Sequence, residues 1–272
     1  MFLKRTAVTL VLLPLGIAVI ALGGWLYYGL IAIILGIAAY EYVKLFEAGG
    51  LQPARLLVTS ATLVLAVQRA ASGFANAHLT ISLILLLALA YHLVQYERGS
   101  DHAATEFAVT LSGILYIGWL GGYLISLRML PDGLWWLLTV LLAVWIADGG
   151  AYLVGSRFGK HKMTPRLSPK KSWEGYLGGI LFSVPLTALL ASLWPLWAGP
   201  GLAITPLRAA CLALVLSVLT ILGDLGESMI KRQVGLKDSG NLLPGHGGIF
   251  DRIDSWLWAA VIGYYLIQSF FI

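Results

Sequence analysis

The chain is poor in charge and has almost no cysteine. Only 11% of its 272 residues are charged, whereas 59% are hydrophobic, and its mean hydropathy is +0.84. A soluble domain carries roughly a quarter charged residues, so this composition excludes an ordinary soluble protein and indicates an integral membrane protein. The single cysteine, Cys211, lies in an apolar run, which excludes a disulfide framework and a cysteine-ligated metal site. No internal repeat or low-complexity tract is found.

Long apolar runs make up most of the sequence instead. They are continuous rather than alternating, which favours helices over a β-barrel, and each has about 16–22 residues, near the ~20 needed to cross a bilayer. The sequence therefore predicts an all-α fold, a polytopic bundle of about nine transmembrane helices. The expected spans are 7–22, 25–43, 54–69, 77–95, 107–127, 134–154, 175–194, 204–222 and 254–271.

The basic residues predict the orientation of this bundle. If the N-terminus is cytoplasmic, three of the 18 Lys and Arg residues, Arg69, Arg128 and Arg208, fall on the far side and the other 15 on the cytoplasmic side. Lys4 and Arg5 before the first apolar run are also compatible with a cleaved signal peptide. Because a second span follows at once and no A-x-A site is clear, an uncleaved first helix is the better interpretation.

The polar residues are concentrated in two stretches, 156–174 and 223–253, which both fall on the predicted cytoplasmic side. Charge at this density is expensive in a membrane protein and marks a functional site. We therefore expect residues 1–130 to form a scaffold of lipid-facing transmembrane helices. Residues 131–272 are expected to form the catalytic region, which carries both loops.

The 156–174 loop is rich in cations. Ser168 and Pro169 form a predicted turn before Lys170 and Lys171, and Ser172 lies where the next helix is expected to begin. Cations, hydroxyls and the backbone amides of a helix start are suited to binding phosphate. The alternative is a basic loop that only fixes the topology or contacts anionic lipid headgroups.

The second polar stretch combines acids, cations and glycines. Asp224 and Lys231 share one face of a helix that is expected to continue past the eighth span. Asp251 and Asp254 are spaced i, i+3 at the start of the ninth span, after a glycine-rich turn at 244–248 that exposes backbone amides. Carboxylates from two helix ends suit Mg²⁺, and cations beside them suit phosphate, as in phosphoryl and nucleotidyl transfer. The alternative is a set of ion pairs at the membrane–water interface.

Two further residues in this half have more than one interpretation. His246, beside glycines, is more often a loop hydrogen-bonding residue than a base or a ligand. Asp148 lies toward the cytoplasmic end of the sixth predicted span. A carboxylate inside a span is a functional candidate by default, although it also suits a helix cap or an ion pair with an arginine.

The segment 228–254 also carries a longer pattern, made up of Ser228, Lys231, Arg232, Lys237, Asp238, Pro244, His246, Gly247, Gly248, Asp251, Arg252 and Asp254. This pattern resembles the signature of the phosphatidate cytidylyltransferase family, the CDP-diacylglycerol synthases, with every fixed position filled. The Ser168–Gly175 loop and the Asp148-Gly149 pair are similar to other polar landmarks of that family. The resemblance is close over about 145–260, and the N-terminal half shares only its helical character.

The resemblance implies a reaction in which CTP and phosphatidic acid give CDP-diacylglycerol and pyrophosphate, with Mg²⁺ as cofactor. It implies Asp224 and Asp251 as the principal metal ligands, with Asp254 or Asp148 as helpers. Cations would screen the two anionic reactants, and Lys170 and Lys171 would hold the CTP phosphates. The candidate residues are Asp224, Lys231, Arg232, Lys237, Asp251 and Asp254 for catalysis, and Ser168, Lys170, Lys171, Lys237 and His246 for binding.

Two other functions are weighed against this one. A CTP-dependent lipid kinase of the dolichol or phytol type would transfer the γ-phosphoryl group and release CDP. A transporter would line a path through several helices with charged residues, whereas only Asp148 is assigned to a span. The expected partners are the bilayer and the two substrates, with no nucleic acid. The expected location is a bacterial inner membrane, with the active site on the cytoplasmic face. The sequence leaves open whether the chain forms a homodimer.

Overall fold

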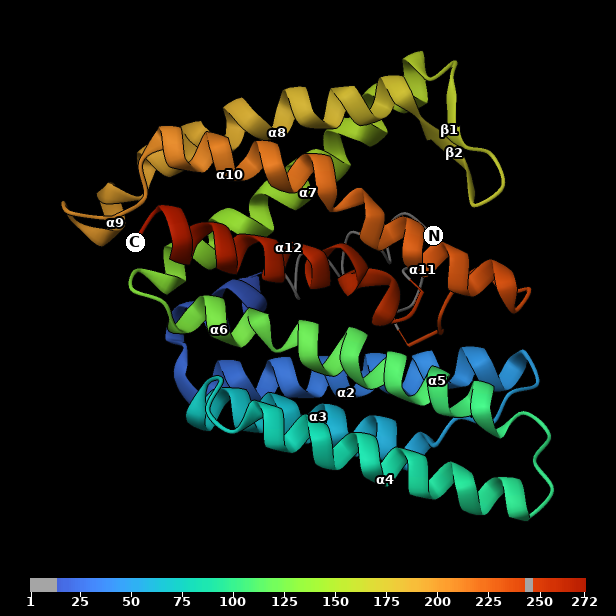
Figure 1. Ribbon diagram of the computed structural model, residues 1–272. Helices are drawn as coiled ribbons and strands as arrows, with labels where there is room; N and C mark the ends of the chain where they lie inside the picture. The colour runs from blue at the N-terminus through green and yellow to red at the C-terminus, as the bar shows by residue number, and fades with distance from the viewer. Residues whose placement is uncertain (1–13, 243–246) are drawn as a thin grey trace. The chain divides into compact units, whose positions relative to one another are not determined.

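The computed structural model of the protein describes residues 14–242 and 247–272, which are mostly helical (Figure 1). Residues 14–22 are helical, and the chain turns at Gly23, whose φ of 66° places it in the left-handed region. The elements that follow are α2 (Gly24–Ala48), α3 (Arg55–Ser72), α4 (Ala77–Glu97), α5 (Ala103–Gly113), the π-helix η1 (Ile114–Trp119), α6 (Tyr123–Met129), α7 (Gly133–Phe158), β1 (Lys162–Thr164), β2 (Ser168–Ser172), α8 (Trp173–Leu193), α9 (Pro195–Ala198), α10 (Pro206–Leu219), α11 (Ile221–Gln233) and α12 (Phe250–Phe270).

Long apolar helices dominate the described part of the chain, as the sequence predicts. α3 and α12 coincide with the third and ninth predicted spans and have 18 and 21 residues, but they are less apolar than the others. Within residues 14–242 and 247–272, six helical stretches are long and apolar enough to cross a membrane: Gly24–Ala48, Ala77–Glu97, Ala103–Met129, Gly133–Phe158, Trp173–Ala198 and Pro206–Gln233.

Three local features differ from the simple helical prediction. The fifth predicted span is interrupted by the π-helix η1. The eighth is divided at Thr220, where α10 ends and α11 begins. The 156–174 loop contains an antiparallel hairpin of β1 and β2, with Lys162 opposite Ser172 and Thr164 opposite Ser168. This hairpin has no apolar alternation, so the periodicity of the sequence could not reveal it.

The chain packs as two compact units. The first unit contains the residues up to Ser126 together with Ile230–Ile253, and the second contains Leu127–Met229 and Asp254–Ile272. Within the first unit, α2 packs against α3, and α3 packs against η1. Gly118 of η1 lies so close to α3 that an added Cβ would be 3.0 Å from the Cα of Thr62, so the lack of a side chain here lets the two helices pack closely.

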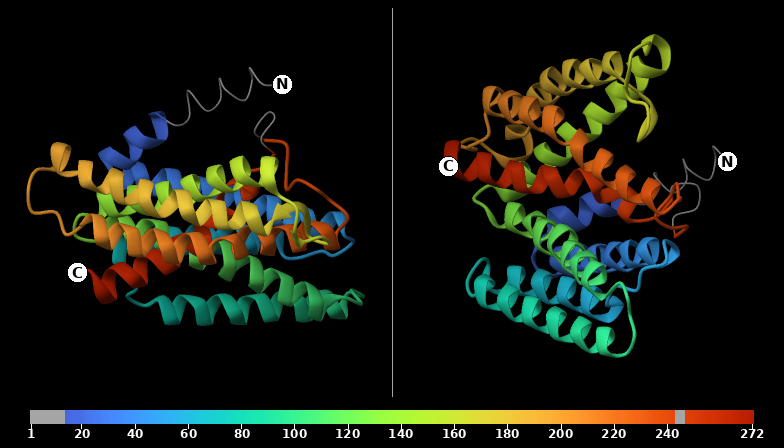
Figure 2. Two further views of the ribbon diagram at one scale, coloured as in Figure 1. Left: turned by 90° about the horizontal axis from the view of Figure 1, so that it is seen from above. Right: turned by 45° about the vertical axis from the view of Figure 1, so that its right-hand side comes forward.

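In the second unit, α8 packs against both α7 and α10 (Figures 1 and 2). Gly179 of α8 lies against the backbone of Ala147 on α7, where an added Cβ would be 2.6 Å from the carbonyl oxygen. Such small residues let two membrane helices approach closely. Ser172 caps α8, because its side chain accepts a hydrogen bond from the Gly175 amide at 3.2 Å. The cap joins the β1–β2 hairpin directly to the start of this helix.

Candidate active site

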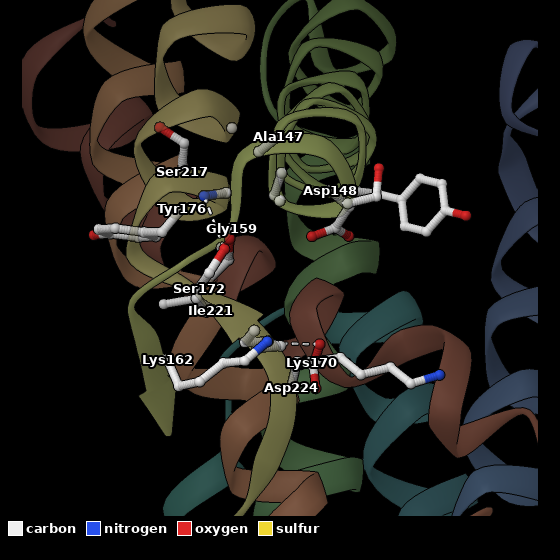
Figure 3. A pocket seen from close by; sticks show the side chains of 18 residues that line it. Ala147, Asp148, Gly159, Lys162, Lys170, Ser172, Tyr176, Ser217, Ile221 and Asp224 are labelled. Carbon is white, nitrogen blue, oxygen red and sulfur yellow. Dashed lines mark hydrogen bonds and ion pairs between the residues drawn. The ribbon is translucent and has the colours of Figure 1, made fainter. Parts of the chain in front are cut away.

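A cavity of about 580 Å³ lies within the second unit, between α7, β2, α8, α10 and α11 (Figure 3). Its walls are partly small residues of the α7–α8 contact, such as Gly155, Gly175 and Gly179. Five charged residues line it, although they come from separate parts of the sequence. They are Asp148, Lys162, Lys170, Lys171 and Asp224.

Asp224 occupies the α11 side of this cavity. Its Oδ2 lies 2.6 Å from Nζ of Lys171, and its Oδ1 accepts a hydrogen bond from Ser228 Oγ at 3.3 Å. The hydrogen bond between Ser228 and Asp224 confirms that α11 continues past the eighth predicted span. These residues are four positions apart, so their side chains lie on one face of the helix. The Asp224 side chain remains 38% exposed and that of Lys171 23%, so both groups are accessible to a ligand in the cavity.

The hairpin that carries the lysines is held at the start of α8 by Glu174. The carboxylate of Glu174 accepts hydrogen bonds from the amides of Lys160 and His161, both at 3.1 Å, and also contacts the His161 ring. Lys170 and Lys171 are thereby placed at the cavity. Ser168, also predicted to bind substrate, begins β2 and is not among the residues that line it.

A second polar cluster lies within the first unit and is centred on Asp251. Oδ1 of Asp251 is 2.6 Å from Nζ of Lys231, and both side chains are nearly buried, at 5% and 11% exposed. Oδ2 accepts hydrogen bonds from the Ser239 amide at 2.9 Å, the Ser239 hydroxyl at 3.0 Å and the Gly248 amide at 2.8 Å. Asp251 therefore organises the backbone on both sides of the glycine-rich turn.

The other predicted residues are distributed between these regions. Arg232 and Lys237 are exposed, and the Arg232 guanidinium donates to the Leu236 carbonyl at 3.1 Å. Asp254 is buried, and its Oδ1 accepts from the Ser255 amide at 2.6 Å. His246 lies outside the described residues. Asp224 and Asp251 belong to different packing units, and their joint metal site stays a prediction.

The donor set of the cavity suits magnesium. Among residues 14–242 and 247–272, no three His, Cys, Asp or Glu side chains are grouped as metal ligands. The cavity does offer the carboxylates of Asp148 and Asp224 beside three lysines. Mg²⁺ is usually held by one or two carboxylates together with substrate phosphates, so a site completed by a nucleotide fits these residues.

Two residues of the Asp251 cluster were missed by the sequence argument. Glu41 of α2 is only 6% exposed, and its Oε2 accepts from the Phe250 amide at 2.8 Å and from Ser239 Oγ at 3.2 Å. Ser239 thus contacts both Glu41 and Asp251. An acidic residue inside an apolar run was the available signal for Glu41, whereas nothing in the sequence distinguishes Ser239 from other loop serines.

Comparison with known proteins covers nearly the whole chain. Residues 3–270 match the cytidylyltransferase family. A phosphatidate cytidylyltransferase of Synechocystis is 33% identical, over 94% of this chain and 92% of the relative. One from Bacillus subtilis is 38% identical over 74% and 71%, and one from Staphylococcus haemolyticus is 32% identical over 93% and 94%. The chain belongs to the cytidylyltransferase family.

Proposed function

We infer that this protein transfers CMP from CTP to phosphatidic acid, giving CDP-diacylglycerol and pyrophosphate. The observation that carries the inference is the family match over residues 3–270, with relatives named phosphatidate cytidylyltransferase. The cavity supports it, because lysines and carboxylates together suit a nucleotide triphosphate and its metal. The apolar helices support it as well, because one substrate is a lipid.

The proposed reaction needs charge screening more than proton transfer. A phosphatidate oxygen, already an anion, forms a bond to the α-phosphorus of CTP, and the bond from that phosphorus to the bridging oxygen of pyrophosphate breaks. Lys170 and Lys171 are proposed to hold the CTP phosphates, and Lys231, Arg232 and Lys237 to neutralise the remaining charge. Ser168 and His246 stay in the proposed binding set on the strength of the resemblance.

Magnesium is the proposed cofactor, with Asp224 and Asp251 as its principal ligands and Asp148 or Asp254 as helpers. When bound, it would neutralise phosphate oxygens and stabilise the charge of the transition state. Each principal carboxylate is already paired with a lysine, Asp224 with Lys171 and Asp251 with Lys231. Each lysine would therefore also balance the charge of its carboxylate when no metal ion is bound.

The finer topology is also a proposal. We propose about nine spans with a cytoplasmic N-terminus, in a bacterial inner membrane, with the active site on the cytoplasmic face. The supporting observations are the bias of Lys and Arg toward one set of loops and the bacterial origin of the relatives. Labelling of single cysteines placed in the hairpin tests the orientation, since labelling from outside intact cells would contradict it. Crosslinking in the membrane tests for a homodimer.

The reaction is tested with purified protein, phosphatidic acid, Mg²⁺ and CTP labelled separately at the α- and γ-phosphates. We expect the α-label to enter the lipid and the γ-label to leave as pyrophosphate. Entry of the γ-label into the lipid would show a lipid kinase instead. If neither label enters the lipid, transfer chemistry is excluded for these substrates and transport becomes the function to test.

Replacement of both hairpin lysines is expected to weaken CTP binding selectively. Hydrogen bonds to charged groups contribute about 1.5–3 kcal/mol, so Lys170→Ala with Lys171→Ala is expected to raise the KM for CTP by roughly 10- to 100-fold or more. The KM for phosphatidic acid is expected to change much less. Arg166→Ala is the matched control, because Arg166 is an exposed cation at the tip of the same hairpin and does not line the cavity. A change confined to the lipid KM would instead make the hairpin a headgroup clamp.

A further inference from the structure

The carboxylate of Glu41 lies against a loop almost two hundred residues away in sequence. Glu41 is near the C-terminal end of α2, and its carboxylate accepts hydrogen bonds from Ser239 Oγ and Phe250 N, which precede and follow residues 240–249 of the chain. Phe250 is the first residue of α12, so its amide is one of the donors that a helix start leaves without an intrahelical partner. Glu41 therefore caps α12 from a different helix.

The loop backbone is shaped around this carboxylate. An added Cβ at Gly240 would be 2.6 Å from Glu41 Oε1, and one at Gly248 would overlap Glu41 Oε2 and Ser239 Oγ. Only glycine can bring the backbone this close to the carboxylate. Glu41 thus lies against the backbone of both Gly240 and Gly248, in addition to accepting the two hydrogen bonds.

Ser239 connects Glu41 to the candidate metal ligand Asp251. Its hydroxyl lies 3.2 Å from Glu41 Oε2 and 3.0 Å from Asp251 Oδ2, and its amide donates to the same Asp251 oxygen. In turn, the Asp251 amide donates to Ser239 Oγ at 3.3 Å. A displacement of Glu41 would therefore be transmitted through Ser239 to Asp251 and to its partner Lys231.

We propose that Glu41 is a positioning residue for cytidylyl transfer, which fixes Ser239 and the start of α12 at Phe250 and through them the orientation of Asp251 and Lys231. The proposal rests on the proposed function above. In this role Glu41 touches no reacting atom. Its effect on the rate comes from geometry, since small misplacements of reacting or metal-holding groups slow catalysis strongly.

The test compares Glu41→Ala and Glu41→Gln with Glu47→Ala and Glu47→Gln. Glu47 lies on the same helix but forms ion pairs with Lys44 and Arg55 outside this cluster. For folded, purified Glu41→Ala protein we expect kcat to fall by about 10²-fold, with the KM for CTP within about threefold of wild type. Glu41→Gln retains an acceptor for Phe250 and Ser239, so we expect it to stay within about tenfold of the wild-type kcat. The Glu47 variants should match wild type.

A second readout does not depend on turnover. Amide hydrogen exchange in peptides covering 238–252 is expected to accelerate by at least about tenfold in Glu41→Ala, while the rest of the first unit keeps its wild-type rates. Ser239→Ala is expected to break the same connection between Glu41 and Asp251, because it removes the hydroxyl that contacts both carboxylates. The double variant Ser239→Ala with Glu41→Gln should lose no more kcat than Ser239→Ala alone, as for residues in one network. The Ser239→Ala and Glu41→Gln variants keep the positioning role testable if Glu41→Ala does not fold.

The possible results distinguish a failure of the proposed function from a failure of the positioning role of Glu41. If wild-type protein transfers neither label, the proposed function fails, and the exchange data still decide whether Glu41 fixes the loop. If wild type is active and Glu41→Ala has normal kcat per folded molecule, the positioning role is overturned. A loss of activity with faster exchange across the whole first unit would also overturn it, because that result describes a residue that only stabilises the fold.

Discussion

The Asp224→Asn variant is expected to lose at least about 10³-fold in kcat while keeping the melting temperature of the wild-type protein. Asparagine has the shape of aspartate but no charge, so it cannot balance Lys171 or bind a divalent cation comparably. The Asp224–Lys171 pair is partly exposed, at 38% and 23%. Exposed ion pairs contribute only about 0–1 kcal/mol, so stability should hardly change.

The measurement is CMP transfer over a range of Mg²⁺ concentrations, together with a thermal melt in the same detergent. Asp101→Asn is the matched control, since Asp101 is exposed and belongs to neither polar cluster. A kcat within about tenfold of wild type at saturating Mg²⁺ would remove Asp224 from the metal site. A lowered melting temperature would instead show that the residue mainly stabilises the fold.

The Asp251→Asn variant is expected to lose activity to a similar degree and stability as well. Asp251 is 5% exposed, and its carboxylate holds Lys231, Ser239 and Gly248 together. Removing one partner of a buried ion pair typically costs about 3–5 kcal/mol, because the other charge stays buried. Because both residues are predicted as metal ligands, the resemblance alone gives no reason for Asp224→Asn and Asp251→Asn to differ in stability. The burial of Asp251 predicts the difference.

A double variant separates the two losses of Asp251→Asn. Lys231→Met removes the buried charge that Asp251→Asn leaves behind, so we expect the pair of changes to recover much of the melting temperature. Activity should not recover, because both the carboxylate and the ammonium are then absent. If Asp251→Asn alone melts like wild type, the central role of Asp251 in this loop is contradicted. Recovery of turnover in the double variant would exclude both residues from the reaction.

Helices were the most predictable part of this protein, and the reason is simple. A continuous apolar run of about 20 residues satisfies its backbone in a membrane by forming a helix, so length and composition suffice to place α2, α4 and α7 within a few residues. The break at Thr220 and the β1–β2 hairpin were not predicted. Both depend on hydrogen bonds and packing that leave no periodic signal in the sequence.

The candidate site was predictable in its residue types but not in its pairings. Spacing alone predicted that a helix carrying Asp224 continues past the eighth span, and the contact of Asp224 with Ser228, one turn further on, confirms it. The pairing of Asp224 with Lys171 joins segments more than fifty residues apart, which no local pattern reveals. The rule that a carboxylate within a span is functional was applied to Asp148 alone. It applies equally to Glu41, which lies inside the span predicted over 25–43.

The contact between Glu41 and the distant loop also constrains how the protein is made. Glu41 and Ser239 are separated by 198 positions, and a ribosome adding roughly 5–20 residues per second needs roughly 10–40 s to synthesise that distance. Throughout this interval α2 carries an acidic side chain whose eventual partners do not yet exist. In the nascent helix the Glu41 side chain must therefore stay hydrated at the membrane surface or be covered by another protein. Synthesis of the C-terminal part of the chain is the event that supplies Ser239 and Phe250 as donors to Glu41.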